Sequence, residues 1–167
     1  VLQEPFLFSR TLKENLAITN ENLTLSDIRE AARAACLDET IQGFSKGYET
    51  FVGERGVTLS GGQKQRAAIA RMLTQKTPIM IFDDSLSAVD AETDAKIRAQ
   101  LNTKLGDSTV ILISHRITTL CEADKILVLE GGRLVDEGTH EELIQKPGLY
   151  RRIAEIQDAL PKGGDAA

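Results

Sequence analysis

The sequence lacks the features that define several large classes of protein. It has 167 residues, no tryptophan and two cysteines, Cys36 and Cys121, whose spacing fits no disulfide framework or metal motif. We therefore expect two reduced thiols in a cytosolic protein. No apolar run approaches the ~20 residues of a membrane-spanning helix, and the first residues do not resemble a signal peptide.

The charge balance argues against nucleic acid as a partner. Net charge is −5 and the isoelectric point is about 5.1, so the chain lacks the basic surface typical of nucleic-acid-binding proteins. Hydrophobic residues make up 41% and charged residues 27% of the sequence, the usual balance of a soluble globular domain. The length is enough for one domain with a buried core.

The most informative stretch spans residues 58–90. In it, LSGGQ opens into KQRAAIARML, whose composition favours a helix. Ser60 and Gln63 have the spacing of a capping box, which would explain both residues without a ligand. Gly61 and Gly62 need another reason, because glycine in a helix costs about 1 kcal/mol relative to alanine. They are suited to the close approach of an anion, such as a phosphate, to the first amides of the helix.

A second segment in this stretch is the apolar run IMIF, which predicts a buried strand and is followed by Asp83 and Asp84. A single aspartate at a strand end is often only a cap or a turn residue. In an open parallel sheet, however, ligands bind beyond the carboxyl ends of the strands. Two adjacent carboxylates there suit a hard cation such as Mg²⁺.

A histidine follows the next predicted strand. Residues 109–113 are apolar and β-branched, and they lead to His115. If the two strands are parallel, His115 lies at the same rim as the aspartates, although a local structural partner would also account for it. His140 falls in the capping box of a later helix and is expected at the surface.

The remaining pattern predicts helices joined by turns. Helices are expected over residues 11–17, from 24 onward, over 37–44, from 91 to 105, from 139 onward and over 149–160, with a hairpin over 125–135.

Taken together, LSGGQ, IMIFD and SAVD resemble, in their order, the nucleotide-binding domain of ATP-binding cassette (ABC) transporters. Further segments match the family's order. Gln3 resembles the Q-loop, residues 52–56 (VGERG) the x-loop of exporters, and residues 114–116 the switch-histidine loop. VGERG and the QEPFLF segment favour an exporter.

The resemblance implies an α/β fold: an incomplete P-loop NTPase (RecA-like) parallel sheet with flanking helices and an inserted ABC α-helical subdomain. Residues from about 5 to 75 would form the helical subdomain, from about 76 to 160 the core, and 161–167 a tail. The parent protein would lie in the cell membrane, with this domain on its cytoplasmic face. Its transmembrane domains would contact the Phe6–Phe8 segment, although a place in the core of a small helical lobe would also account for these residues.

The resemblance also implies that this chain contributes different residues to two ATP sites. Cassette domains bind two ATP molecules between head-to-tail partners, so Ser60, Gly61, Gly62 and Gln63 would complete the site of a second nucleotide-binding domain, and we expect the dimer to be a heterodimer.

In this subunit's own site, Asp83 and Gln3 would hold Mg²⁺. Asp84 and His115 would be the catalytic residues, and Asp90 would link the two sites.

Two departures from the family pattern qualify this assignment. The phosphate-binding pattern G-x-x-x-x-G-K-S/T is absent: Gly56 and Gly61 have its glycine spacing, but Gly62 stands where lysine is needed. We therefore expect the C-terminal two-thirds of a nucleotide-binding domain, unable to hold ATP tightly alone.

Asp84 replaces the family's glutamate. Its carboxylate is set back because aspartate is one methylene shorter, and a misplacement of ~1 Å can cost about a hundredfold in rate. This resembles the degenerate site of heterodimeric exporters, although a second water would let Asp84 act adequately.

Two alternatives remain open at this point. One is a soluble, non-transport ABC ATPase, for which the acidic composition offers no nucleic-acid surface. The other is a non-catalytic module that docks on a partner through the LSGGQ face. The transported substrate leaves no trace in this sequence.

Overall fold

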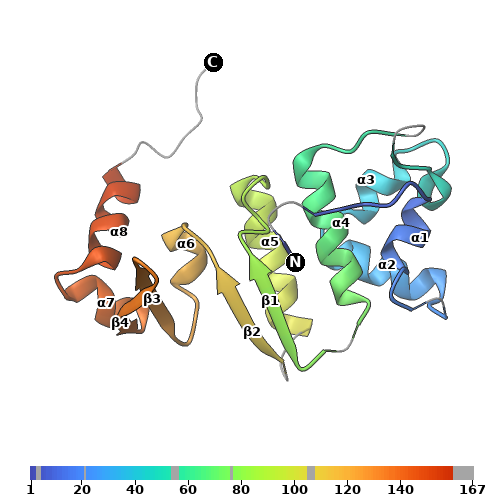
Figure 1. Cartoon of the computed structure of the whole chain (residues 1–167). Helices are drawn as coiled ribbons and strands as arrows, with labels where there is room; N and C mark the ends of the chain where they lie inside the picture. The colour runs from blue at the N-terminus through green and yellow to red at the C-terminus, as the bar shows by residue number, and fades with distance from the viewer. Residues whose placement is uncertain (3–4, 21, 54–56, 76, 105–107, 160–167) are drawn as a thin grey trace, which may run out of the picture. The chain divides into compact units, whose positions relative to one another are not determined.

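A computed structural model describes residues 1–2, 5–20, 22–53, 57–75, 77–104 and 108–159 (Figure 1). The predictions made for Gln3, for the centre of VGERG and for a tail over residues 161–167 fall outside these residues. The chain forms two compact units, Val1–Ile113 and Ser114–Ala167.

The first unit begins with a group of helices, four of which start where the sequence predicts. These four are α1 (Leu12–Leu16), α2 (Leu25–Ala34), α3 (Asp38–Gln42) and α4 (Gly61–Leu73); the 3-10 turn η1 (Gly47–Glu49) was not predicted. Three of them open with a complete capping box, in which the threonine or serine before the helix and an acidic or amide side chain three residues later satisfy each other's backbone amides.

These helices share one core with the sheet. The predicted apolar face of α2 is buried, with Ile28 and Ala32 fully inaccessible. Met80 and Phe82 join the same cluster, together with Ile97 and Leu101 of the following helix, α5 (Ala91–Lys104). The helix carrying LSGGQ and the strand carrying the aspartates are therefore parts of one packed body.

The sheet of this unit has two strands among the described residues. β1 (Ile79–Asp83) pairs in parallel with β2 (Thr109–Ile113), and Asp83 lies opposite Ile113, so both strands end at the same rim as expected. This register confirms the predicted parallel arrangement.

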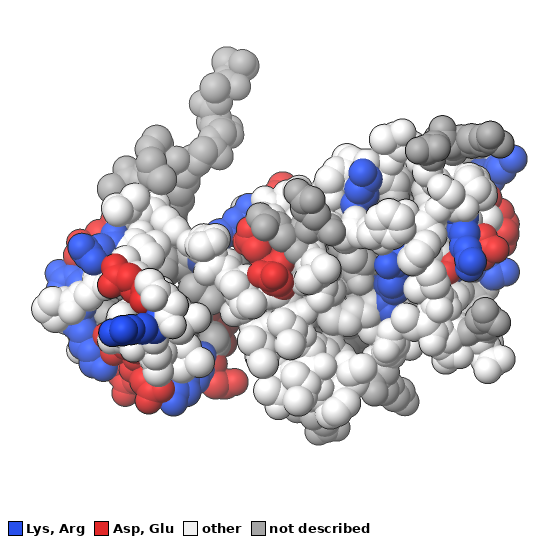
Figure 2. Space-filling model, viewed as in Figure 1, with Lys and Arg blue, Asp and Glu red and all other residues white. Residues whose placement is uncertain are grey.

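One face of β1–β2 is exposed, unlike the buried strand that the sequence predicts. Ile79 and Ile81 are 58% and 50% accessible, and Ile111 and Ile113 of β2 are 45% and 49% accessible. Figure 2 shows this surface as an uncharged area below a group of acidic side chains. Parallel strands are normally covered on both faces, so the sheet is incomplete in the part of the chain that the structure describes.

The second unit is built on an antiparallel hairpin. It contains α6 (Ile117–Leu120), β3 (Ile126–Glu130), β4 (Arg133–Gly138), α7 (His140–Gln145) and α8 (Leu149–Ala159). Its core joins Ile126 and Val128 to Leu143 and Tyr150. α6 was not predicted, because four residues are too short to show a helical period. No helix within the described ranges is long and apolar enough to span a membrane.

Candidate functional site

The N-terminus of α4 carries the LSGGQ residues. The Gln63 amide donates to Ser60 Oγ at 3.2 Å, and the Ser60 amide donates to Gln63 Oε1 at 2.9 Å, which confirms the capping box. The amides of Gly61 and Gly62 are among the first of the helix, which have no intrahelical acceptor. They lie at the positive end of a 13-residue helix dipole. This is the geometry that an anion site requires.

The two glycines differ in their surroundings. A Cβ atom on Gly62 would lie 2.7 Å from the carbonyl oxygen of Ala88, whereas one on Gly61 would lie 3.5 Å from the Ala88 side chain, an ordinary contact. Gly62 therefore has a packing reason for lacking a side chain. The approach of a ligand, predicted as the reason for both glycines, is therefore not needed to explain Gly62.

A buried glutamine joins this helix to the segment that follows β1. Gln65 is 3% accessible; its Oε1 accepts from the Ala88 amide at 2.9 Å and its Nε2 donates to Ser87 Oγ at 3.1 Å. Gln65 was not among the residues predicted from the sequence. The pattern that could have indicated it is the helical spacing: Gln65 lies four positions before Ile69 and therefore on the same, buried face of the helix.

Asp83 and Asp84 lie where β1 ends. The Asp83 amide donates to the Val1 carbonyl and the Asp84 amide to the Ile113 carbonyl, both at 2.9 Å. Both side chains are half-buried. Asp84 has φ of +43°, in the left-handed region that aspartate tolerates better than most residues. This conformation turns the chain out of the strand and into the segment of residues 84–90, hereafter the 84–90 loop.

Asp90 closes the 84–90 loop and directly precedes α5. Its Oδ1 accepts from the Thr93 amide at 2.9 Å, and this hydrogen bond, with that of the Thr93 side chain, lowers the pKa of the exposed Asp90 carboxyl. The structure therefore gives Asp90 a helix-capping role. The predicted link between two ATP sites stays a prediction.

Mg²⁺ requires oxygen ligands but few of them from protein. Among the described residues, no three His, Cys, Asp or Glu side chains converge as a self-sufficient metal site. Mg²⁺ beside a phosphate substrate usually takes only one or two carboxylates and completes its shell with water and phosphate oxygens. Asp83, half-buried at the end of a strand, fits that requirement.

The histidines both belong to the second unit. His115 is exposed, and its carbonyl accepts from Gln157 Nε2 at 2.6 Å, while Gln157 Oε1 accepts from the Ile117 amide at 2.9 Å. The backbone that carries His115 is thus fixed by α8, and its predicted catalytic role stays a prediction. His140, which was expected at the surface, is half-buried instead, because its Nδ1 lies 2.8 Å from the hydroxyl of the buried Tyr150.

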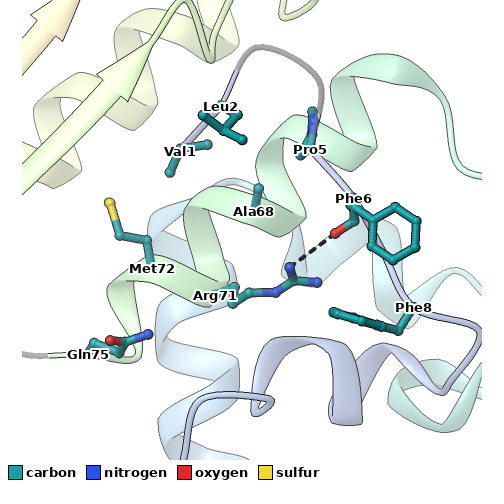
Figure 3. Close-up of a pocket in the computed structure, with 9 residues that line it drawn as sticks. All are labelled: Val1, Leu2, Pro5, Phe6, Phe8, Ala68, Arg71, Met72 and Gln75. Atoms are coloured by element: carbon teal, nitrogen blue, oxygen red, sulfur yellow. Dashed lines mark hydrogen bonds between the residues drawn. The ribbon is translucent and has the colours of Figure 1, made fainter.

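A pocket of about 370 Å³ lies between the N-terminal segment and α4 (Figure 3). Its wall includes Arg71, which donates from Nη1 to the Phe6 carbonyl at 3.0 Å and from Nε to the Asn15 carbonyl at 2.8 Å. Burial lowers the pKa of the Arg71 guanidinium. Phe6 and Phe8 pack edge to face and remain 69% and 41% accessible, so the pocket has an apolar rim.

Comparisons with known proteins agree with this geometry. A family model described as "ABC transporter" matches residues 1–87. The chain is similar to the putative multidrug export ATP-binding/permease protein YgaD of Bacillus subtilis (strain 168), with 46% identity over 158 residues, 95% of this chain and 27% of that protein. It is also similar to the uncharacterized ABC transporter ATP-binding protein YfiB of the same organism, with 48% identity over 157 residues, 94% of this chain and 27% of that protein.

A solved structure shows the same fold. A bacterial Atm1-family ABC exporter with ATP bound superposes with a TM-score of 0.89 at 39% identity, covering 94% of this chain and 28% of that one. This likeness confirms the predicted fold class. The chain spans about a quarter of the length of the relatives that it matches.

Proposed function

The chain belongs to the ABC transporter family, and from this premise we propose that it is part of the nucleotide-binding domain of an ABC exporter, where ATP binding and hydrolysis drive transmembrane export. Residues from about 5 to 75 would be the helical subdomain and from about 76 to 160 the core.

The N-terminus of α4 carries the proposal. It combines a complete Ser60–Gln63 capping box, two first-turn amides without an intrahelical acceptor and two glycines that leave those amides uncovered. We propose that these four residues bind the γ-phosphate of an ATP held mainly by a second nucleotide-binding domain, as in a head-to-tail dimer. Their close match to the family signature suggests that the partner's site is the more active one.

This subunit's own site would use the rim of β1. Asp83 and Gln3 would hold Mg²⁺, which supplies charge neutralisation for phosphoryl transfer. Asp84 would orient the attacking water and His115 would contact the γ-phosphate. Since Asp84 is one methylene shorter than glutamate, we propose that this site hydrolyses ATP slowly and that the dimer is heteromeric.

The pocket beside α4 would receive the membrane domains. Phe6 and Phe8 at its exposed rim would suit an apolar side chain from a short segment of a transmembrane domain. Arg71 of α4 donates to the Phe6 carbonyl and so connects the N-terminal segment to this helix. Movement of α4 after hydrolysis would then reach the membrane. We propose that the domain lies on the cytoplasmic face of the cell membrane.

As it stands, the chain is expected to be inactive. It contains no G-x-x-x-x-G-K-S/T sequence to supply the amide cradle and lysine that grip phosphates. Calorimetric titration of Mg-ATP into the chain should detect no binding. Micromolar binding that disappears in Ser60→Arg would instead mean that α4 holds ATP unaided and would contradict this account.

The signature assignment is tested in the intact exporter with its partner. Ser60→Arg should abolish ATP hydrolysis at the partner's site, because the long cationic side chain fills the space before the amides. Ser45→Arg, the same change at another exposed serine of the first unit, is the matched control. Near-normal turnover with Ser60→Arg would reject the assignment and favour a docking module without catalysis.

A further inference from the structure

We infer that Gln65 is a positioning residue that couples the two ATP sites, by holding the 84–90 loop and the N-terminus of α4 together as one body. The inference rests on the proposed function, which assigns Asp84 to this subunit's own site and Ser60 to the partner's. Nothing in that assignment involves Gln65, which has no place in either site.

The attachment consists of two hydrogen bonds from one buried side chain. Gln65 is 3% accessible, accepts from the Ala88 amide and donates to the Ser87 hydroxyl, at 2.9 and 3.1 Å. Ser87 and Ala88 lie 22 and 23 residues after Gln65 in the sequence, so the contact is tertiary and is not needed to form the helix. An apolar side chain of the same size would leave the Ala88 amide without its acceptor.

Close packing at the same point makes the attachment stiff. The Gly62 backbone approaches the Ala88 carbonyl so closely that a Cβ atom would lie 2.7 Å from its oxygen. Ala88 is therefore held through its amide by Gln65 and confined on its carbonyl side by Gly62. The loop cannot slide along the helix without breaking one contact or compressing the other.

The ends of the loop are fixed to two other elements. Asp84 is bound to β2 through its amide, and Asp90 caps α5. Gln65 provides a third attachment, between these ends. Displacement of Asp84 when nucleotide occupies this subunit's site is thus passed through Ser87 and Ala88 to the first turn of α4, which faces the other nucleotide.

A double-mutant cycle tests the coupling in the intact exporter. The partner's own signature is first disabled, so that this subunit's site is silent and turnover reports the partner's site alone. Asp84→Ala then alters that turnover only through the loop. We expect Gln65→Met to lower kcat about ten- to hundredfold, as for a small misplacement of catalytic groups, with KM for ATP changed less than threefold. Adding Asp84→Ala to Gln65→Met should have no further effect, because the connection is already broken.

The controls separate this role from a general loss of structure. Gln100→Met makes the same change at an exposed position of α5 and should keep wild-type kcat. In the chain itself, hydrogen exchange at the Ala88 amide should accelerate in Gln65→Met while exchange in the middle of α4 is unchanged. If Gln65→Met does not fold, Ser87→Ala replaces it in the cycle and should show a smaller loss of the same kind.

Each other outcome overturns the idea. Unchanged Ala88 exchange, unchanged kcat, or additive effects of Gln65→Met and Asp84→Ala would each reject the coupling role. So would a partner's site that ignores Asp84→Ala altogether. A wild-type exporter without ATP hydrolysis would reject the proposed function instead, and the inference with it.

Discussion

The contact between Gly62 and Ala88 leads to a quantitative prediction. In Gly62→Ala the new Cβ atom would lie 2.7 Å from the Ala88 carbonyl oxygen, whereas ordinary contact begins at 3.4 Å. The loop cannot retreat freely, because Gln65 holds the Ala88 amide. Overpacking of this kind costs about 1 to 3 kcal/mol, and the better helix propensity of alanine returns at most about 1 kcal/mol. We expect a net destabilisation of about 1 kcal/mol.

Gly61→Ala is the matched comparison, one residue earlier in the same turn. Its Cβ atom would meet only the Ala88 side chain, at 3.5 Å. The gain in helix propensity is then not opposed, so the variant should be as stable as the wild type or more stable, by up to about 1 kcal/mol.

Urea denaturation followed by circular dichroism measures both free energies of unfolding. The denaturant slope must agree among the variants before midpoints are compared, and hydrogen exchange in α4 reports the first unit separately from the second. Equal stability of Gly62→Ala and Gly61→Ala would show that Ala88 yields without cost and would refute the packing argument.

Two further predictions concern other residues of the first unit. Asp84→Glu should raise hydrolysis at this subunit's own site in the intact exporter, measured with the partner's site disabled; unchanged turnover would count against a degenerate site. Asp38→Ala should destabilise the first unit by about 3 kcal/mol, because it removes a buried carboxylate that accepts from Tyr48 and Arg29; Glu39→Ala, an exposed neighbour, should have little effect in the same urea assay. Burial alone would raise the pKa of Asp38, but the hydrogen bonds from Tyr48 and Arg29 bring it below the ordinary 3.8. Its stabilisation is therefore complete above the unfolded pKa and is lost as pH falls through the lower folded value, which an acid titration of the wild type against Asp38→Ala would detect.

Sequence reasoning succeeded where the determining interactions are local. The helices after Thr11, Thr24, Ser60 and Thr139 all begin at capping boxes whose partners are three residues apart, so the pattern is visible in the chain itself. The two strands were also predictable, because both are short β-branched or apolar runs that lead to polar residues, and their parallel pairing was implied by the resemblance to the family. Their common rim followed from that topology.

The missed features depend on contacts between distant residues. Gln65 reaches Ala88 and Arg71 reaches Phe6, pairs separated by 23 and 65 positions, and no local pattern specifies either partner. The exposure of Ile79 and Ile81 was missed for a related reason. An apolar run predicts that a strand is buried but cannot say whether the chain supplies both layers that would cover it.

The two glycines of LSGGQ have different explanations, one in packing within the chain and one in an approach from outside it. Gly62 is already required by the Ala88 carbonyl, so its presence alone is weak support for a phosphate. Gly61 has no such neighbour, and its lack of a side chain is left unexplained unless something outside the chain approaches its amide. Gly61→Ala should therefore keep or raise the stability of the chain and yet lower hydrolysis at the partner's site in the intact exporter. A Gly61→Ala exporter that is both stable and fully active would remove the strongest reason for placing a phosphate at this helix.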